Sequence, residues 1–93
     1  MVSDMAIAAI FEIPDFTDEQ YAKTLTDLEA AGLGKPNGRI SHMAASMDKG
    51  LFIVDQWESE EALGAFAEKL VPIIIAAGAT PAEPRVFQVH NTL

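Results

Sequence analysis

The apolar residues of the chain fall into six segments, and the spacing within each predicts its secondary structure. In residues 5–13, every second side chain is apolar and most of these are large, while Ala6 and Ala8 between them are small, which indicates a strand covered on both faces. Residues 39–46 and 51–57 predict two further strands, and the short link between them, with aspartate and glycine, is typical of a hairpin turn. A last strand is expected over residues 85–91.

A helix is predicted directly after the first strand, because its start is clearly marked. Thr17 is a typical N-cap residue, and Gln20 stands three positions later, which completes a capping box. Phe16, just before the cap, can pack on Tyr21 as a hydrophobic staple. The apolar stripe of this helix consists of Tyr21, Leu25 and Leu28.

A second helix is expected after residue 57, with Ser59 as its N-cap and acidic residues in its first turn. Pro72 removes a backbone donor, so a kink or a restart is expected there. The apolar stripe consists of Leu63, Phe66, Leu70 and Ile74.

The order strand, helix, strand, strand, helix, strand predicts an α+β fold of the ferredoxin-like type, as one domain over residues 1–93. Such a fold has a four-stranded antiparallel sheet with both helices on one face. Whichever alternate set of side chains points away from the helices in residues 5–13 and 51–57, that set is mainly apolar. We therefore expect a homodimer in which the two sheets pack against each other.

The charge balance and the absence of cysteine exclude several classes of function. Fourteen acidic residues against six basic ones give a formal net charge of −8, which makes nucleic acids and anionic membranes poor partners. Without cysteine there can be no disulfide, thiolate metal site or cysteine nucleophile. The apolar runs are too short to span a bilayer, and the N-terminal segment lacks the basic start of a signal peptide. A soluble cytoplasmic protein is expected.

The candidate chemistry lies in the central hairpin. If Ser46 faces Leu51, the register places His42 opposite Asp55 on the same face of the sheet. A carboxylate bonded to one ring nitrogen fixes the tautomer and makes the other nitrogen a better base, so His42 is a candidate general base oriented by Asp55. A bulge at the turn would shift the register by one residue and pair His42 with Gln56 instead. A purely structural histidine–aspartate pair is the other interpretation.

Trp57 and His90 are further candidates for contact with a substrate. Trp57, the only tryptophan, is expected opposite Ile40, where it packs the start of the second helix onto the sheet and borders a pocket. His90 lies on the last strand and is either a substrate contact or a residue of the surface or the dimer interface. Because the second and last strands form opposite edges of a ferredoxin-like sheet, His42 and His90 are not expected to share a metal ion.

The segment DQWESEEA at residues 55–62, with Phe66 and Pro72 after it and VHN at residues 89–91, resembles the dimeric α+β barrel superfamily. Its antibiotic-biosynthesis-monooxygenase-like branch is the most similar. The resemblance implies a homodimer whose two sheets form a barrel, and a small-molecule cavity between sheet and helices. Tyr21 and Phe66 would line that cavity.

The haem-degrading members of this superfamily carry an asparagine on the first strand and a tryptophan and a histidine on the second helix. The first strand here has no asparagine, and Phe66 and Ala76 stand where the tryptophan and the histidine would align. Haem degradation is therefore not expected. Neither a metal nor an organic cofactor is predicted.

Two functions follow from these residues. One is a cofactor-independent, monooxygenase-like enzyme that acts on a hydrophobic aromatic or enolisable molecule, with His42 as base. The same base would serve an isomerisation or a cyclisation. The other is a non-catalytic dimeric protein that uses the same cavity for binding or interaction. The fold alone does not choose between them.

Overall fold

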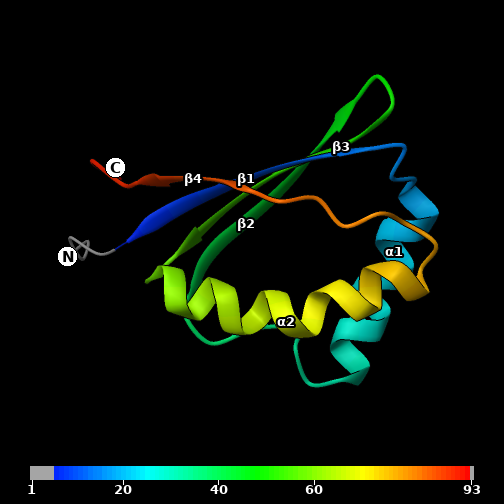
Figure 1. Ribbon diagram of the computed structural model, residues 1–93, viewed down its shortest axis with the longest axis horizontal. Helices are drawn as coiled ribbons and strands as arrows, with labels where there is room; N and C mark the ends of the chain where they lie inside the picture. Colours follow the sequence, from blue (N-terminus) through cyan, green and yellow to red (C-terminus); the bar gives the residue numbers. More distant parts are fainter. Residues whose placement is uncertain (1–5, 93) are drawn as a thin grey trace.

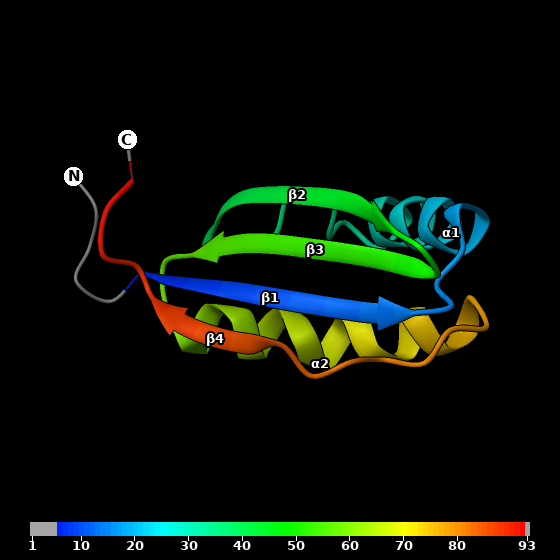
Figure 2. The same ribbon diagram turned by 90° about the horizontal axis from the view of Figure 1, so that it is seen from above.

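The chain forms a four-stranded antiparallel sheet with two helices on one of its faces, as the sequence predicts. A computed structural model describes residues 6–92. The sheet order is β2-β3-β1-β4, and Figures 1 and 2 show both helices beneath the same face. The elements are β1 (Ile7–Pro14), α1 (Asp18–Ala30), β2 (Arg39–Met47), β3 (Gly50–Trp57), α2 (Glu60–Ala76) and β4 (Arg85–Gln88).

The last strand is shorter than the sequence pattern predicts. β4 pairs only with β1, over Ile7 to Ile10, and it ends at Gln88. One further bond, from the Val89 amide to the Ala6 carbonyl at 3.0 Å, continues this pairing to the first described residue of the chain. His90 therefore lies beyond the strand and not on it. Met5, expected in the first strand, is outside the described residues.

The start of α1 has the predicted capping box. The Thr17 hydroxyl accepts from the Gln20 amide, and the Gln20 side chain accepts from the Thr17 amide, both at 3.0 Å. Phe16 meets Tyr21 edge-on, with ring centroids 6.1 Å apart. Because Phe16 is buried against the sheet, this staple holds the first turn of α1, and Tyr21 with it, over the sheet.

The second helix begins as predicted but does not restart at Pro72. The Ser59 hydroxyl accepts from the Ala62 amide at 3.1 Å, and the helix then runs without a break to Ala76. Pro72 and Glu68, whose carbonyl would have received the missing bond, are both exposed, so solvent can satisfy that carbonyl. Within residues 6–92, no helix is long and apolar enough to cross a membrane.

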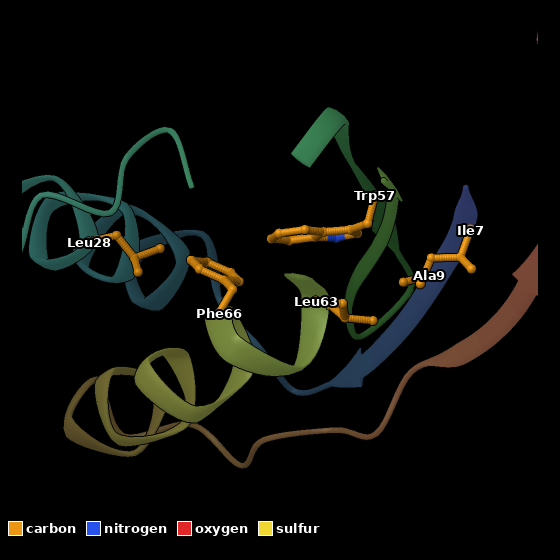
Figure 3. Packing of buried hydrophobic residues seen from close by; sticks show 6 residues of the cluster. All are labelled: Ile7, Ala9, Leu28, Trp57, Leu63 and Phe66. Atoms are coloured by element: carbon orange, nitrogen blue, oxygen red, sulfur yellow. The ribbon is translucent and has the colours of Figure 1, made fainter. Parts of the chain in front are cut away.

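The core between sheet and helices is organised around Trp57, which is 0% exposed. Its ring projects from β3 toward Phe66 of α2 and Leu28 of α1, as Figure 3 shows. The Trp57 and Phe66 rings lie 5.3 Å apart. Trp57 thus joins β3 to both helices, while Ile7, Ala9 and Leu63 complete this cluster.

The opposite face of the sheet has no helix over it, and its centre is apolar. Cross-strand pairing places Ile10, Val54 and Met43 in one row of this face. Met43 is 55% exposed, and Phe87 on β4 is 51% exposed. An ion pair from Arg85 to Glu12, at 3.0 Å, lies beside this apolar centre. The predicted apolar outer face is therefore present.

Candidate functional site

The central hairpin has the register that places His42 opposite Asp55. The Asp55 carboxylate lies 2.6 Å from Nδ1 of His42. The alternative register is excluded, because Gln56 pairs with Ser41. Gly50 forms the turn with a φ of 126°, and the pairing from Met47 and Gly50 onward is regular up to His42 and Asp55.

Asp55 is a buried carboxylate with partners on both of its oxygens. It is 4% exposed, and its second oxygen accepts a hydrogen bond from the indole N–H of Trp57 at 3.3 Å. A buried charge is tolerated only when it is paired and hydrogen-bonded. Trp57 and His42 supply those bonds, so Trp57 contributes to the site by holding Asp55 in addition to its packing.

Tyr21 reaches the other side of the His42 ring, a contact that the sequence pattern did not predict. Its hydroxyl oxygen lies 2.8 Å from Nε2, and the two rings are nearly parallel, with centroids 6.3 Å apart. An ionised Asp55 can only accept, so Nδ1 of His42 donates to it. In neutral His42, Nε2 is then an acceptor, and the Tyr21 O–H donates to it. The four side chains Tyr21, His42, Asp55 and Trp57 form one hydrogen-bonded chain.

A bulge at the start of β2 turns Arg39 toward this chain of side chains. The pairing shifts between Arg39 and Ser41, so that Arg39, and not Ile40, lies opposite Trp57. The expected pairing of Trp57 with Ile40 is therefore wrong. Ile40 is instead 54% exposed. The Arg39 guanidinium donates to the Gly34 carbonyl at 3.2 Å. Bulges commonly redirect a side chain in this way beside functional sites.

A pocket of about 230 Å³ lies between the sheet and the helices, with this polar group at its wall. Its remaining wall is almost wholly apolar, and residues 81–84, which run back from α2 toward β4 in Figure 1, close one side. The lining residues are Phe11, Ile13, Phe16, Tyr21, Thr24, Leu25, Leu28, Arg39, His42, Ile53, Asp55, Leu63, Phe66, Ala67, Leu70, Val71, Ile74, Pro81, Ala82, Glu83 and Pro84.

The candidate residues from the sequence therefore separate into two groups. Tyr21, His42, Asp55 and Phe66 line the pocket. Trp57 lies behind the wall, where it touches the pocket residues Asp55 and Phe66. His90 is exposed beyond β4 and is not a lining residue. Contact of Trp57 or His90 with a ligand stays a prediction.

The environment of Tyr21 keeps its phenol protonated. Burial raises the pKa of Tyr21 above its ordinary value of 10.0, and the negative charge of Asp55 raises it further. The positive charge of Arg39 opposes this rise. Around neutral pH the phenol is therefore a hydrogen-bond donor and not a phenolate.

Within residues 6–92, no three His, Asp or Glu side chains lie close enough together to hold a metal ion. His42 belongs to the edge strand β2, and His90 follows the edge strand β4 on the other side of the sheet. The two histidines are thus separated, as the strand order predicts.

Three solved structures show how widely this architecture occurs. SnoaB, a cofactor-independent oxygenase from Streptomyces nogalater, is 13% identical, with a TM-score of 0.65 over 98% of each chain. The ActVA-Orf6 monooxygenase of Streptomyces coelicolor, solved with Nanaomycin D, is 16% identical, with a TM-score of 0.61 over 95% of this chain and 88% of that one. A conserved protein from Methanosarcina mazei is 14% identical, with a TM-score of 0.59 over 91% of this chain and 93% of its own.

At identities this low, the matches show that the backbones are arranged alike, but they do not show that the proteins catalyse the same reaction. No protein-family model matches the chain, and no curated protein matches it either. The matches to solved structures nevertheless extend over nearly the whole chain, including both helices and all four strands. The chain therefore has the α+β fold of the antibiotic-biosynthesis-monooxygenase-like proteins.

Proposed function

We propose that the protein is a cofactor-independent, monooxygenase-like enzyme that acts on a hydrophobic aromatic or enolisable molecule. The observation that carries this proposal is the His42–Asp55 pair, 2.6 Å apart, at the wall of an apolar pocket. Two proteins of the same fold are described as a cofactor-independent oxygenase and a monooxygenase, which supports this class of reaction.

In the proposed reaction His42 is the base and Asp55 orients it. Removal of a proton from the substrate leaves an electron-rich enolate or phenolate, which can itself transfer electrons to dioxygen. Where the reacting carbon bears two hydrogens, a C–O bond to dioxygen gives a hydroperoxide, and loss of water then leaves a carbonyl. No external reductant is required. The buried carboxylate would stabilise the imidazolium that forms, as general-base catalysis needs.

We also propose that the protein is a homodimer, assembled through the outer face of the sheet. The apolar row of Ile10, Val54 and Met43 supports this, because an uncovered sheet face of this kind favours association. The pocket is lined by the helices, the helix-facing side of the sheet and residues 81–84, so packing of the outer faces of two sheets would not cover its lining.

Oxygen uptake with a panel of quinols, anthrones and enolisable ketones tests the enzymatic proposal. We expect at least one compound to be oxidised, and His42→Gln and Asp55→Asn to lower kcat about a hundredfold or more. Asp48→Asn, in the exposed hairpin turn, should leave the rate unchanged. Near-ultraviolet circular dichroism would check that each variant is folded.

The alternative is a non-catalytic protein that binds a small molecule in the same pocket. The contact of Tyr21 with Nε2 of His42 favours it, because this nitrogen is the one a base must offer. Binding of panel compounds without any protein-dependent oxygen uptake would support this alternative. Full activity in His42→Gln would instead remove His42 from the mechanism.

A further inference from the structure

His42 lines the pocket, but both nitrogens of its ring already have hydrogen-bond partners. Nδ1 of His42 is bonded to Asp55 at 2.6 Å, and Nε2 is bonded to the Tyr21 hydroxyl at 2.8 Å. Neither ring nitrogen is therefore open to a substrate in this arrangement. Because Phe16 meets the Tyr21 ring edge-on and the His42 ring lies parallel to it, the phenol is held in place from two sides.

A hydroxyl that donates to His42 is still able to accept. The Tyr21 oxygen has two lone pairs, and its own proton points at Nε2. A ligand group that donates a hydrogen bond to this oxygen extends the hydrogen-bonded chain, which then runs from the ligand through Tyr21 and His42 to Asp55. An O–H group suits this position, whereas a C–H group forms only a weak hydrogen bond.

The guanidinium of Arg39 is a positive charge that can interact with the hydroxyl oxygen of such a ligand. Arg39 lines the same pocket as Tyr21, and its positive charge acts on the Tyr21 phenol. Within residues 6–92, the guanidinium makes one hydrogen bond, to the Gly34 carbonyl, although it carries several N–H donors. The polar side chain Thr24, in contrast, already donates to the Gln20 carbonyl at 2.8 Å.

The volume and the walls limit the size of the ligand. A cavity of about 150 Å³ with apolar walls can hold a benzene molecule. The pocket here measures about 230 Å³, and its other lining residues are mainly aromatic and aliphatic, such as Phe11, Phe66 and Leu63. This combination suits two fused rings with a single polar edge.

We propose that Tyr21 is the catalytic group that contacts the substrate, and that the substrate is a bicyclic aromatic compound with a phenol or enol hydroxyl. Its proton passes through Tyr21 to His42, and Arg39 faces the oxygen that remains. This inference rests on the proposed function and names the substrate class of the same site.

The proton transfer balances without any further reactant. The O–H bond of the substrate breaks, and its proton goes to the Tyr21 oxygen. The original Tyr21 proton goes to Nε2 of His42, so Tyr21 ends as it began. The substrate keeps the electron pair as an oxyanion beside Arg39, and the imidazolium of His42 is paired with Asp55. A neutral ligand and a neutral histidine thus become one anion and one cation.

A matched pair of ligands tests this inference independently of turnover. Calorimetry would measure the binding of 1-naphthol and of 1-methoxynaphthalene, which has the same rings but no hydroxyl proton. We expect wild type to bind the naphthol about tenfold more tightly, as one additional hydrogen bond would give. Tyr21→Phe, which keeps the ring, should remove this preference and still bind the methoxy compound.

A spectroscopic readout tests the position of Arg39. Bound naphthol should show its naphtholate absorption band at a lower pH than free naphthol does, and Arg39→Met should abolish this shift. If the shift persists in Arg39→Met, then Arg39 does not face the oxygen.

Equal binding of the two ligands by wild type, or binding of neither, would overturn the inference. A naphthol preference that survives in Tyr21→Phe would also overturn it, because the hydroxyl would then be bound elsewhere. The comparison within wild type decides the matter even if Tyr21→Phe fails to fold. These failures differ from failure of the proposed function, which would appear as the absence of oxygen uptake that depends on His42.

Discussion

At the scale of single residues, Tyr21 is influenced by two opposite charges, and its ionisation can report on both. It is the only tyrosine of the chain, so an ultraviolet difference titration observes it alone. We expect it to ionise above 10.0, the ordinary value of its pKa, because burial disfavours the phenolate. Asp55→Asn removes a negative charge that disfavours the phenolate, so the pKa of Tyr21 should fall. Arg39→Met removes a positive charge that favours the phenolate, so the pKa should rise.

The opposite signs of these two shifts serve as the control. A substitution that merely loosened the packing would expose Tyr21 and move its pKa back toward 10.0 in both variants. A fall in Arg39→Met would therefore contradict the placement of Arg39 beside the phenol. The comparison is confined to the pH range in which circular dichroism shows each variant to be folded.

The residues of the site differ in how far the sequence could predict them. His42 and Asp55 follow from the hairpin register, because matching apolar residues across two adjacent strands leaves few alternatives. The bond from Tyr21 to His42 depends on how α1 packs over β2, which no local pattern specifies. Arg39 was missed because the bulge reverses the alternation of β2 before His42, and nothing in RISH marks it.

At the scale of elements, the hairpin of β2 and β3 depends on the backbone of Gly50. Its φ of 126° is unfavourable for any residue with a Cβ, and a Cβ there would overlap the carbonyl oxygen of Ile13. The Asp15 amide also bonds to the Lys49 carbonyl at 3.1 Å, which ties the end of β1 to this turn. We expect Gly50→Ala to lower the free energy of unfolding by about 1–3 kcal/mol, measured from urea denaturation.

Gly64→Ala is the matched control for this substitution. Gly64 lies inside α2, and a Cβ there would meet no atom within 4 Å apart from its chain neighbours and the backbone of its own helix. Because glycine is a poor helix former, this variant should gain about 0.5–1 kcal/mol. Similar destabilisation in both variants would show that the turn of the hairpin is not under the steric restriction that the structure indicates.

The ends of the elements were predicted less well than their order. Capping residues such as Thr17 and Ser59 mark where the helices start, because their side chains bond to backbone amides within the next three residues. The end of β4 has no such local mark. It depends on the pairing of β4 with its single neighbour β1, which no pattern within residues 85–91 specifies.

At the scale of the whole molecule, the sequence predicted the layered arrangement because element order restricts a chain of this length to few folds. It also predicted the apolar outer face, since alternation leaves mainly apolar residues on whichever side the helices do not cover. The resemblance implied a cavity between sheet and helices, but its volume could not be predicted, because it is the space that the packing of α1, α2 and residues 81–84 leaves open.

The proposed dimer can be tested by a substitution on the outer face of the sheet. Met43 is on the edge strand β2, and at 55% exposed it contributes little to the core of one chain. Met43→Lys should therefore leave the thermal stability of the monomer nearly unchanged, yet it would place a charge in the apolar row between two sheets, where desolvation is costly.

Sedimentation velocity should show a dimer for wild type and a monomer for Met43→Lys. Ala22→Lys, exposed on α1, adds the same charge away from that face and should remain dimeric. A monomeric wild type at micromolar concentration, or dissociation of Ala22→Lys alone, would contradict assembly through the sheet.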